Sequence, residues 1–586
     1  MSQPAARPSE GRDPCPLAAE EQAIVHRVSE VFRTSGSKAA VVVFSFPVSD
    51  ALLQCLSREH RITHVISQPS PGVRHVRSLG RSTFPFRTAL VFWSEDIAGL
   101  RWLLLLLRCG AIRVVKISRH PLKSETASAA RYLARGIMNG LEDRALRLIA
   151  MSGNAAARRV AERVAGAPIS RLKLSNCSIS HTQTDGPIIY ATGSLGAGGS
   201  ERQLMLTAKG VYSRCARRVS VICQSPLVGK NRFFASELEN VGISIEDQSS
   251  IRQGSDHTES LQAGFDDDLV RSAFPRNPQL AELVLFFANR FSIERPAIVH
   301  AWLDETNIAA GIAAAMAGVP KIVLGCRSLS PLNFQFYQPY MWQGYRQLAQ
   351  LPQVVILNNS IAGARDYARW LQIRSERIKV IPNGLEFSSV GRPFPLDGSG
   401  GSAQSGKRIV GMVGRIAEEK RPYLWLEIAS EILNMRSDVH FVWAGDGPMR
   451  KDVERRAEQL GISAHLSLLG LVSDVSTVWA SMAVFLLTSR VEGLPNVSIE
   501  AQHFGVPAVV AAVGGAAETI NEGVTGVSVA GDDAQAFAKA VLQFLDSPEA
   551  LARSRSLGPS FVQGRFSVER MIAATMGVYE LEAGTS

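Results

Sequence analysis

Residues 408–447 read RIVGMVGRIAEEKRPYLWLEIASEILNMRSDVHFVWAGDG. The apolar run RIVGMVGRI is followed by a stretch with helical periodicity and then by a second apolar run, DVHFVWAGDG. Strand-like runs recur as HLSLLGLV, AVFLLTS and PAVVAAVGG, each with a helix-like segment after it. This alternation is typical of a parallel sheet with crossover helices, so the segment predicts an α/β domain.

The same plan precedes this segment. Residues 186–204, GPIIYATGSLGAGGSERQL, predict a strand, a glycine-rich turn and a helix. Further strands are predicted at VSVICQSPL, PAIVHAW, PKIVLGCRS, VVILNNS and IKVIPNG. A Pro/Gly/Ser stretch from Gly391 to Lys407 predicts a linker or surface loop between two large halves. Residues 1–182 hold four more strand-like runs, AAVVVFSF, THVIS, ALVFWS and IRVVKIS, and predict a separate α/β accessory domain.

Composition excludes several classes of protein. The chain has 586 residues, of which 46% are hydrophobic and 20% charged, so it is neither largely disordered nor fibrous. The apolar run from Trp102 to Leu107 is far shorter than the roughly 18 residues that span a bilayer. The start shows no apolar stretch typical of a secretion signal, and the seven cysteines show no C-x-x-C spacing. We therefore expect a cytoplasmic protein.

The net charge of +10 suits a nucleic acid, an anionic membrane or a phosphate-bearing substrate. The sequence has no RNA-module aromatic signature and no Cys/His finger, so we expect no nucleic-acid partner. Charge alone does not choose between the other two partners.

Two cations follow the strand predicted at residues 408–414. Arg415 and Lys420 lie at the carboxyl end of this strand, where ligands bind in open α/β sheets, and such a pair could neutralise a diphosphate. The alternative is a solvated helix start in which Glu418 and Glu419 offset the cations. In the next turn, AGDGP, Gly445 lets the backbone approach a ligand closely.

The stretch SRVEGLPNVSIEAQHFGVP (489–507) adds two glutamates, Glu492 and Glu500, with seven residues between them. Between them lie a loop, Gly493, Leu494, Pro495 and Asn496, and the start of a short helix predicted over Val497–Phe504. The N–H groups at the start of that helix suit phosphate oxygens, and Glu500 could accept hydrogen bonds from ribose hydroxyls. Glu492, in the loop before this helix, would point at the transferred group.

In its motifs VGRIAEEK, AGDGP, Glu492-x7-Glu500, GVPAVVAAVGGAAETI and FSVERMIAATMGVYE, the chain resembles glycosyltransferase family 4 over about residues 185–582. The resemblance implies a GT-B fold, with two Rossmann-like domains facing a cleft. The expected domains are 1–182, 183–384 and 385–566, and a terminal helix in 567–586 that packs back on the middle domain.

By this resemblance the C-terminal domain binds a nucleotide sugar. Arg415 and Lys420 would hold the diphosphate, Glu500 the ribose and Glu492 the donor sugar. The backbone of Gly493–Asn496 and Gly445 would lie along the donor, with Leu471 beside its base. Glu518, after Gly514 and Gly515, is a frequent family feature to which we assign no role.

The cleft side of the middle domain also matches the family. Gly198 and Gly199 in LGAGGSERQL would face the cleft, and Asn383 and Gly384 in VIPNGLEF match an interdomain hinge. His300 matches a frequent family His, with either a substrate contact or a structural hydrogen bond as its role. One departure is clear: Arg327 and Ser328 stand where many relatives carry a His that contacts the donor sugar.

The resemblance implies a retaining transferase that needs no metal and no cofactor beyond its nucleotide-sugar substrate. HAWLDETNIAAGIAAAMAGVPKIVLGCRS is also similar to capsule transferases of the Vi-antigen type. That similarity implies a UDP-sugar donor, with a UDP-N-acetylhexosaminuronic acid as one candidate, and a polysaccharide or lipid-linked acceptor. Arg327 is then the candidate to read a sugar carboxylate.

Other functions stay open. The D-x-D spacing within Asp266–Asp268 is one with which other transferases bind a metal, but AGFDDDLVRSAF predicts a helix start. A GT-B epimerase and a non-catalytic GT-B scaffold in a polysaccharide assembly complex are further alternatives. In the accessory domain, the basic residues around Trp102 could dock on the inner face of the plasma membrane or be the solvated ends of a core helix; they are Arg101, Arg108, Arg113, Lys116, Arg119 and Lys123.

Overall fold

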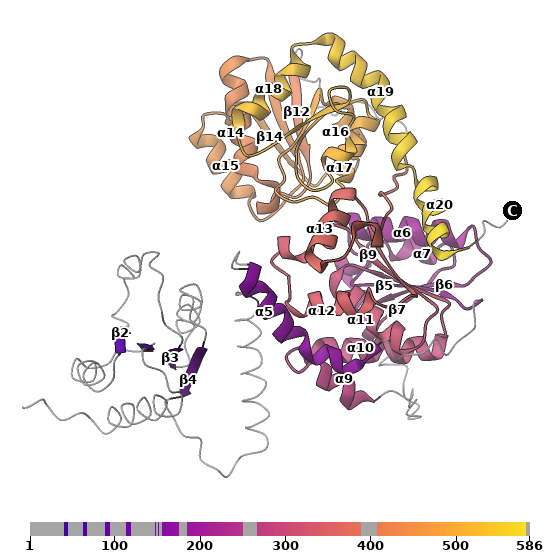
Figure 1. Cartoon of the computed structure of the whole chain (residues 1–586). Coiled ribbons are helices and arrows are strands. Elements are labelled where there is room, and N and C mark those ends of the chain that lie inside the picture. The colour runs from indigo at the N-terminus through magenta and orange to yellow at the C-terminus, as the bar shows by residue number, and fades with distance from the viewer. Residues whose placement is uncertain are drawn as a thin grey trace, which may run out of the picture. The chain divides into compact units, whose positions relative to one another are not determined.

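The computed structural model describes the chain in separate ranges, and Figure 1 draws the remaining residues in grey. The described residues are 40–44, 62–66, 88–93, 113–118, 147, 151, 155–174, 185–249, 266–387 and 407–581. The chain divides into two units, residues 1–165 and residues 166–586. The predicted linker lies outside the described residues except for Lys407.

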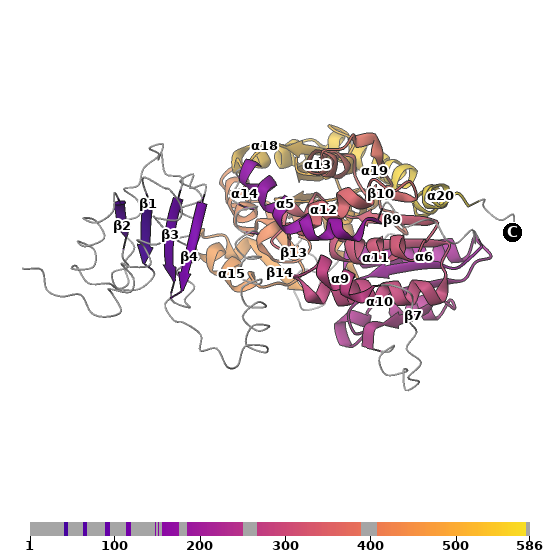
Figure 2. The same ribbon diagram turned by 60° about the horizontal axis from the view of Figure 1, so that its bottom comes forward.

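The first unit contains a parallel sheet of four strands, β1 (Ala40–Phe44), β2 (Ile62–Ile66), β3 (Thr88–Trp93) and β4 (Arg113–Ser118). Their order is β2-β1-β3-β4, and Figure 2 shows them side by side. Each coincides with a run that the sequence predicted as a strand. Of the basic residues around Trp102, only Arg113 and Lys116, in β4, are among the described residues. Helix α5 (Ala155–Gly166) follows.

The second unit holds two further sheets. The sheet of the N-half (residues 185–387) has seven parallel strands in the order β11-β10-β9-β8-β5-β6-β7. Its strands are β5 (Ile188–Thr192), β6 (Val219–Cys223), β7 (Ser244–Asp247), β8 (Ile298–Trp302), β9 (Lys321–Cys326), β10 (Val354–Asn358) and β11 (Ile378–Val380). Its helices are α6 (Gly199–Tyr212), α7 (Ala235–Glu239), α9 (Asp267–Ala273), α10 (Pro278–Glu294), α11 (Asp304–Met316), α12 (Tyr340–Leu348) and α13 (Ile361–Leu371).

The sheet of the C-half (residues 407–566) has six parallel strands in the order β14-β13-β12-β15-β16-β17. These are β12 (Arg408–Val413), β13 (Val439–Ala444), β14 (Leu466–Gly470), β15 (Val484–Leu487), β16 (Ala508–Ala511) and β17 (Gly526–Val529). The helices are α14 (Pro422–Met435), α15 (Arg450–Gln459), α16 (Val475–Ser481), α17 (Asn496–His503), α18 (Ala534–Leu545) and α19 (Pro548–Phe566), followed by α20 (Val568–Tyr579).

Both sheets have buried central strands because helices cover both of their faces. Every residue of β5, β6, β8, β13, β15 and β16 is buried. Such strands read as continuous apolar runs, which is why the sequence reveals them. The fold class predicted from the sequence, two Rossmann-like α/β domains, is confirmed by these two sheets.

The strand order in each half fixes where a ligand can bind. In the C-half the order reverses between β12 and β15, and in the N-half between β5 and β8. Open α/β sheets bind ligands in the crevice outside the carboxyl ends of the strands at such a reversal. The segments after β12, β15 and β5 contain Arg415, Glu492 and Gly198 respectively.

Helix α20 returns the chain to the N-half, where Figure 1 shows it beside α6. A Cβ placed on Gly210 of α6 would lie 1.9 Å from Ile572 Cδ1, so the two helices meet closely at this glycine. Leu385 N donates to Phe566 O at 2.8 Å where the two connecting segments cross. The halves are therefore joined by two adjacent chain segments.

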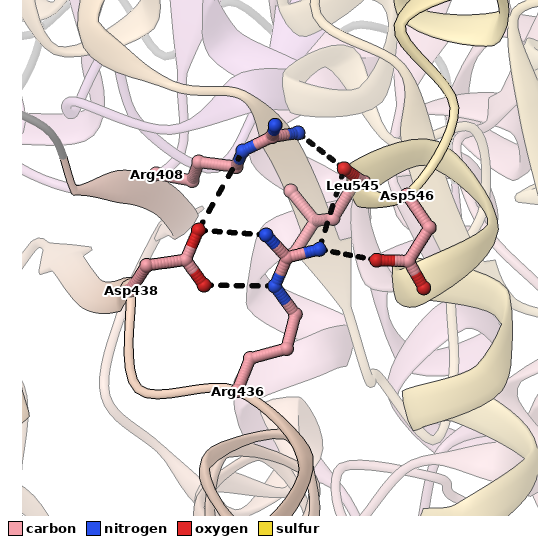
Figure 3. Close-up of polar contacts among 5 residues, drawn as sticks. All are labelled: Arg408, Arg436, Asp438, Leu545 and Asp546. Carbon is pink, nitrogen blue, oxygen red and sulfur yellow. Dashed lines mark hydrogen bonds and ion pairs between the residues drawn. The ribbon is translucent and has the colours of Figure 1, made fainter.

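A charged cluster ties together the ends of three C-half elements opposite the ligand edge (Figure 3). Arg436, after α14, donates to both carboxylate oxygens of Asp438 at 2.8 and 2.6 Å and also pairs with Asp546 after α18. Arg408, at the start of β12, donates to the carbonyl oxygen of Leu545. The Arg436 guanidinium holds the pKa of Asp438 below its usual range. The cluster is structural.

Asp304 begins α11 as a buried carboxyl. Its Oδ1 accepts hydrogen bonds from the hydroxyls of Tyr345 and Tyr367 at 2.7 and 2.5 Å. Burial raises the pKa of Asp304 to about 6, and the two tyrosine hydrogen bonds oppose that rise. Between about pH 4 and pH 6 the folded protein therefore holds a proton here that the unfolded chain has released.

We expect this proton to make stability depend on pH. The free energy of unfolding falls as pH rises from the unfolded pKa through the folded one, because only the unfolded state gains from ionisation. In Asp304→Asn the amide oxygen still accepts hydrogen bonds from both hydroxyls but does not titrate. From pH 5 to pH 8 the free energy of unfolding of this variant should therefore rise by about 1–2 kcal/mol relative to that of the wild type. Denaturant unfolding at both pH values measures this difference, and parallel pH curves would contradict a raised pKa.

Candidate active site

Arg415, after β12, lines a cavity of about 750 Å³. Its side chain is exposed and, among the described residues, makes no hydrogen bond or ion pair. Gln335 of the N-half and Arg490 of the C-half also line this cavity. Glu418, one of the two acids in the alternative of a solvated helix start, pairs with Arg490 at 3.4 Å. Arg415 is free to meet an anion.

Lys420 and Glu492 form an ion pair at this edge. Lys420 Nζ lies 2.6 Å from Glu492 Oε1, and the two side chains are 20% and 12% exposed. The hydroxyl of Thr488, after β15, donates to the carbonyl oxygen of Lys420 at 2.8 Å. The ends of β12 and β15 are thereby joined, and one predicted cation meets one predicted acid.

The loop from Gly493 to Asn496 lies against the N-half. A Cβ on Gly493 would be 2.3 Å from the carbonyl oxygen of Arg327, so only glycine fits. Asn383 donates through its side-chain amide to Leu494 O at 3.1 Å and to Asn496 Oδ1 at 2.7 Å. Pro495 caps α17, which starts at Asn496, one residue before the predicted start. The loop is therefore held by backbone and amide contacts.

Glu500 of α17 pairs with Arg202 of α6, with 2.8 Å between Oε1 and Nη1. These side chains are 21% and 35% exposed. Gly198 caps α6, and a Cβ on Gly199 would lie 3.7 Å from Asn496 Nδ2. The glycine-rich turn and the loop between the two glutamates thus lie close together, and the pairing of Glu500 with Arg202 was not predicted.

Arg327 follows β9 and contacts Asn383, the residue whose side chain also holds the loop from Gly493 to Asn496. Its Nη2 donates to Asn383 Oδ1 at 2.6 Å, and its guanidinium lies 4.7 Å from the centre of the Trp302 ring. Burial lowers the pKa of Arg327 to about 10, so it stays charged at neutral pH. Its Nε is buried without a hydrogen-bond partner in the described structure.

His300 is 1% exposed inside β8. Its Nδ1 lies 2.7 Å from the hydroxyl of Tyr579 in α20, and that hydroxyl donates to Tyr190 at 3.0 Å. Burial lowers the pKa of His300, so the ring is neutral near pH 7. The contacts of Nδ1 are with the terminal helix, not with the residues around Glu492.

Gly445 and Leu471 lie at the ends of β13 and β14. Gly445 has φ of +139°, and a Cβ there would lie 2.0 Å from the carbonyl oxygen of Gly414. Leu471 is 88% exposed, so its side chain is available to a ligand. Neither residue has a hydrogen bond to the Lys420–Glu492 pair within the described ranges.

The helix start predicted at Asp266 is confirmed. Asp266 caps α9 by accepting a hydrogen bond from Leu269 N at 2.9 Å, and Asp267 pairs with Arg271. Among the described residues, no three His, Cys, Asp or Glu side chains are grouped to hold a metal ion. In the same part of the chain no helix is both long and apolar enough to cross a bilayer.

Known proteins and protein families resemble this chain in sequence. Residues 400–558 match the family model of glycosyl transferases group 1, and residues 259–388 match that of glycosyltransferase family 4. The chain is 31% identical over 423 residues to the Vi polysaccharide biosynthesis protein VipC/TviE of Salmonella typhi, covering 66% of this chain and 70% of that protein.

Two further proteins extend the comparison. The chain is 26% identical over 321 residues to the UDP-Gal:alpha-D-GlcNAc-diphosphoundecaprenol alpha-1,3-galactosyltransferase of Escherichia coli, covering 52% of this chain and 82% of that enzyme. The crystal structure of Anabaena Alr3699/HepE in complex with UDP superposes with a TM-score of 0.53 at 21% identity, over 67% of this chain and 99% of that one. The structural likeness establishes the fold, and the chain belongs to the family 4 glycosyltransferases with the GT-B fold.

Proposed function

We propose that this glycosyltransferase moves a sugar from a UDP-sugar to a growing bacterial surface polysaccharide or its lipid-linked precursor. One observation carries the proposal: Lys420 and Glu492 meet at 2.6 Å where the C-half sheet reverses. Arg415 and Lys420 hold the diphosphate, Glu500 the ribose and Glu492 the sugar. Leu471 lies beside the base, and Gly445 lies along the donor.

The charges at this edge support such a reaction. A departing diphosphate carries negative charge, and preorganised cations stabilise it without further reorganisation. When the donor binds, Lys420 leaves its ion pair with Glu492 and pairs with a phosphate oxygen. Arg415 has no described ion pair to give up. The leaving phosphate deprotonates the acceptor hydroxyl on the face from which it departs, so configuration is retained without a metal ion or a side-chain nucleophile.

The printed names of relatives support the substrate classes. The E. coli enzyme is named for a UDP-sugar donor and a diphosphoundecaprenol acceptor, and the Salmonella protein for Vi polysaccharide biosynthesis. A lipid-linked acceptor would bring the protein to the inner face of the plasma membrane as a peripheral protein. The acceptor enters beside Gly198 and Gly199, and His300 fixes α20 behind them.

Arg327 is the residue proposed to select the donor sugar. It stands where many relatives carry a His, it is charged, and its buried Nε has no partner in the described structure. A guanidinium with a free N–H can bind a sugar carboxylate. The candidate donor is therefore a UDP-N-acetylhexosaminuronic acid.

A thermal-shift panel of UDP-, GDP- and ADP-sugars tests the donor site. A ligand at about 100 times its dissociation constant should stabilise the wild type by about 2.7 kcal/mol. The Glu500→Ala variant should lose this shift because the ribose contact is gone. Glu458→Ala, an exposed acid on α15, is the matched control and should keep the shift. No shift with any nucleotide sugar would contradict the proposal and favour a non-catalytic scaffold.

A further inference from the structure

Glu518 makes a contact between the two halves. It follows Gly514 and Gly515 in the C-half, and its carboxylate oxygens accept hydrogen bonds from the backbone N–H groups of Ile361 and Ala362 at 2.8 and 2.7 Å. These are the first two residues of α13 in the N-half. A side chain from one half thus caps a helix of the other.

This contact is strong because it is made at the start of a helix. The first N–H groups of a helix have no partner within it, and a carboxylate is favoured there by the helix dipole. Ser360 Oγ accepts from Gly363 N at 3.0 Å, so Glu518 supplies the partners that Ser360 does not. Hydrogen bonds to a charged acceptor are stronger than those between neutral groups.

The segment that carries Glu518 also touches the loop between the two site glutamates. Gly515 N donates to the carbonyl oxygen of Gly493 at 3.0 Å. A Cβ on Gly514 would lie 1.8 Å from the carbonyl oxygen of Glu492, and one on Gly515 would lie 2.6 Å from Ser360 Cβ. Residues 514–518 therefore lie against both the glutamate loop and the start of α13.

We infer that Glu518 is a positioning residue for sugar transfer. By capping α13 it holds residues 514–518 in place, and these hold the backbone of Glu492 and Gly493 at the cleft. The contact that holds the two halves together then also aligns Glu492. The inference rests on the proposed role of Glu492, but the contact itself can be tested without any substrate.

The test uses the full-length chain and the variants Glu518→Ala and Glu518→Gln. Loss of a helix cap should speed amide exchange at residues 361–362 by about 3- to 30-fold in Glu518→Ala. Exchange in residues 492–496 should rise with it. Misplacing Glu492 should lower kcat by about 10- to 100-fold, while the donor dissociation constant stays within about twofold. Glu518→Gln, which keeps one good acceptor, should fall between wild type and alanine.

Asp533→Ala is the matched control, since Asp533 caps α18 through Gln535 N within the C-half and makes no described contact with the N-half. It should change neither exchange at 361–362 nor kcat. Unchanged exchange at 492–496 in Glu518→Ala, or faster exchange at 361–362 with an unchanged kcat, would overturn the inference. A wild type that transfers no sugar would instead contradict the proposed function. Amide exchange at residues 492–496 would still show whether Glu518 positions this loop.

Discussion

Replacing Lys420 with alanine is expected to lower kcat for sugar transfer by about 10²- to 10³-fold, the usual cost of removing one group that stabilises developing charge. Lys420 is one of two cations proposed to hold the diphosphate. It is also the neighbour of Glu492, whose side chain is only 12% exposed. Without Lys420, Glu492 loses the cation that pairs with it beside a departing anion, so both effects act in the same direction.

Single-turnover transfer at saturating donor measures this loss. Lys451→Ala, on an exposed position of α15, is the control and should transfer at the wild-type rate. In the double variant Lys420→Ala with Glu492→Gln, the loss of transfer rate should be smaller than the two single losses combined, because residues in contact do not act additively. Turnover of Lys420→Ala within threefold of the wild type would contradict the assigned role.

The central strands and the polar edge of the C-half could be predicted from the sequence. Buried parallel strands leave continuous apolar runs, and the residues after them collect at one edge whatever the loops do. The sequence therefore predicts Arg415, Lys420 and Glu492 at one edge of the sheet. Two edge strands were missed: β7, with the sequence SIED, and β17, with GVSV, are short and partly polar.

The contacts between the halves could not be predicted. Arg202 pairs with Glu500 across 298 positions of the sequence, and Glu518 reaches Ile361 across 157. Periodicity and motif spacing describe each half separately, whereas these pairs depend on how the halves meet. The signal that could have pointed to Glu518 was its place three residues after Gly515, since adjacent glycines mark a close backbone approach.

The substitution Gly493→Ala should disable the site while leaving the protein folded. Its Cβ would lie 2.3 Å from the carbonyl oxygen of Arg327 and 2.8 Å from Ser328 Cα. Both are backbone atoms, and the Arg327 carbonyl is further held by Asn359 Nδ2 at 3.1 Å. The glutamate loop must therefore shift away from the N-half. A misplacement of about 1 Å at a reacting centre can cost about 100-fold in kcat/KM.

Helical Gly564 of α19 provides the matched control, because a Cβ there meets nothing within 4 Å. Gly564→Ala should keep full activity and gain about 0.5–1 kcal/mol from the better helix propensity of alanine. The same added methyl group thus has opposite effects at the two positions, and steady-state kinetics with thermal unfolding separates them. Wild-type kcat/KM in Gly493→Ala would mean that the loop can move without cost, and that contact with Arg327 does not position Glu492.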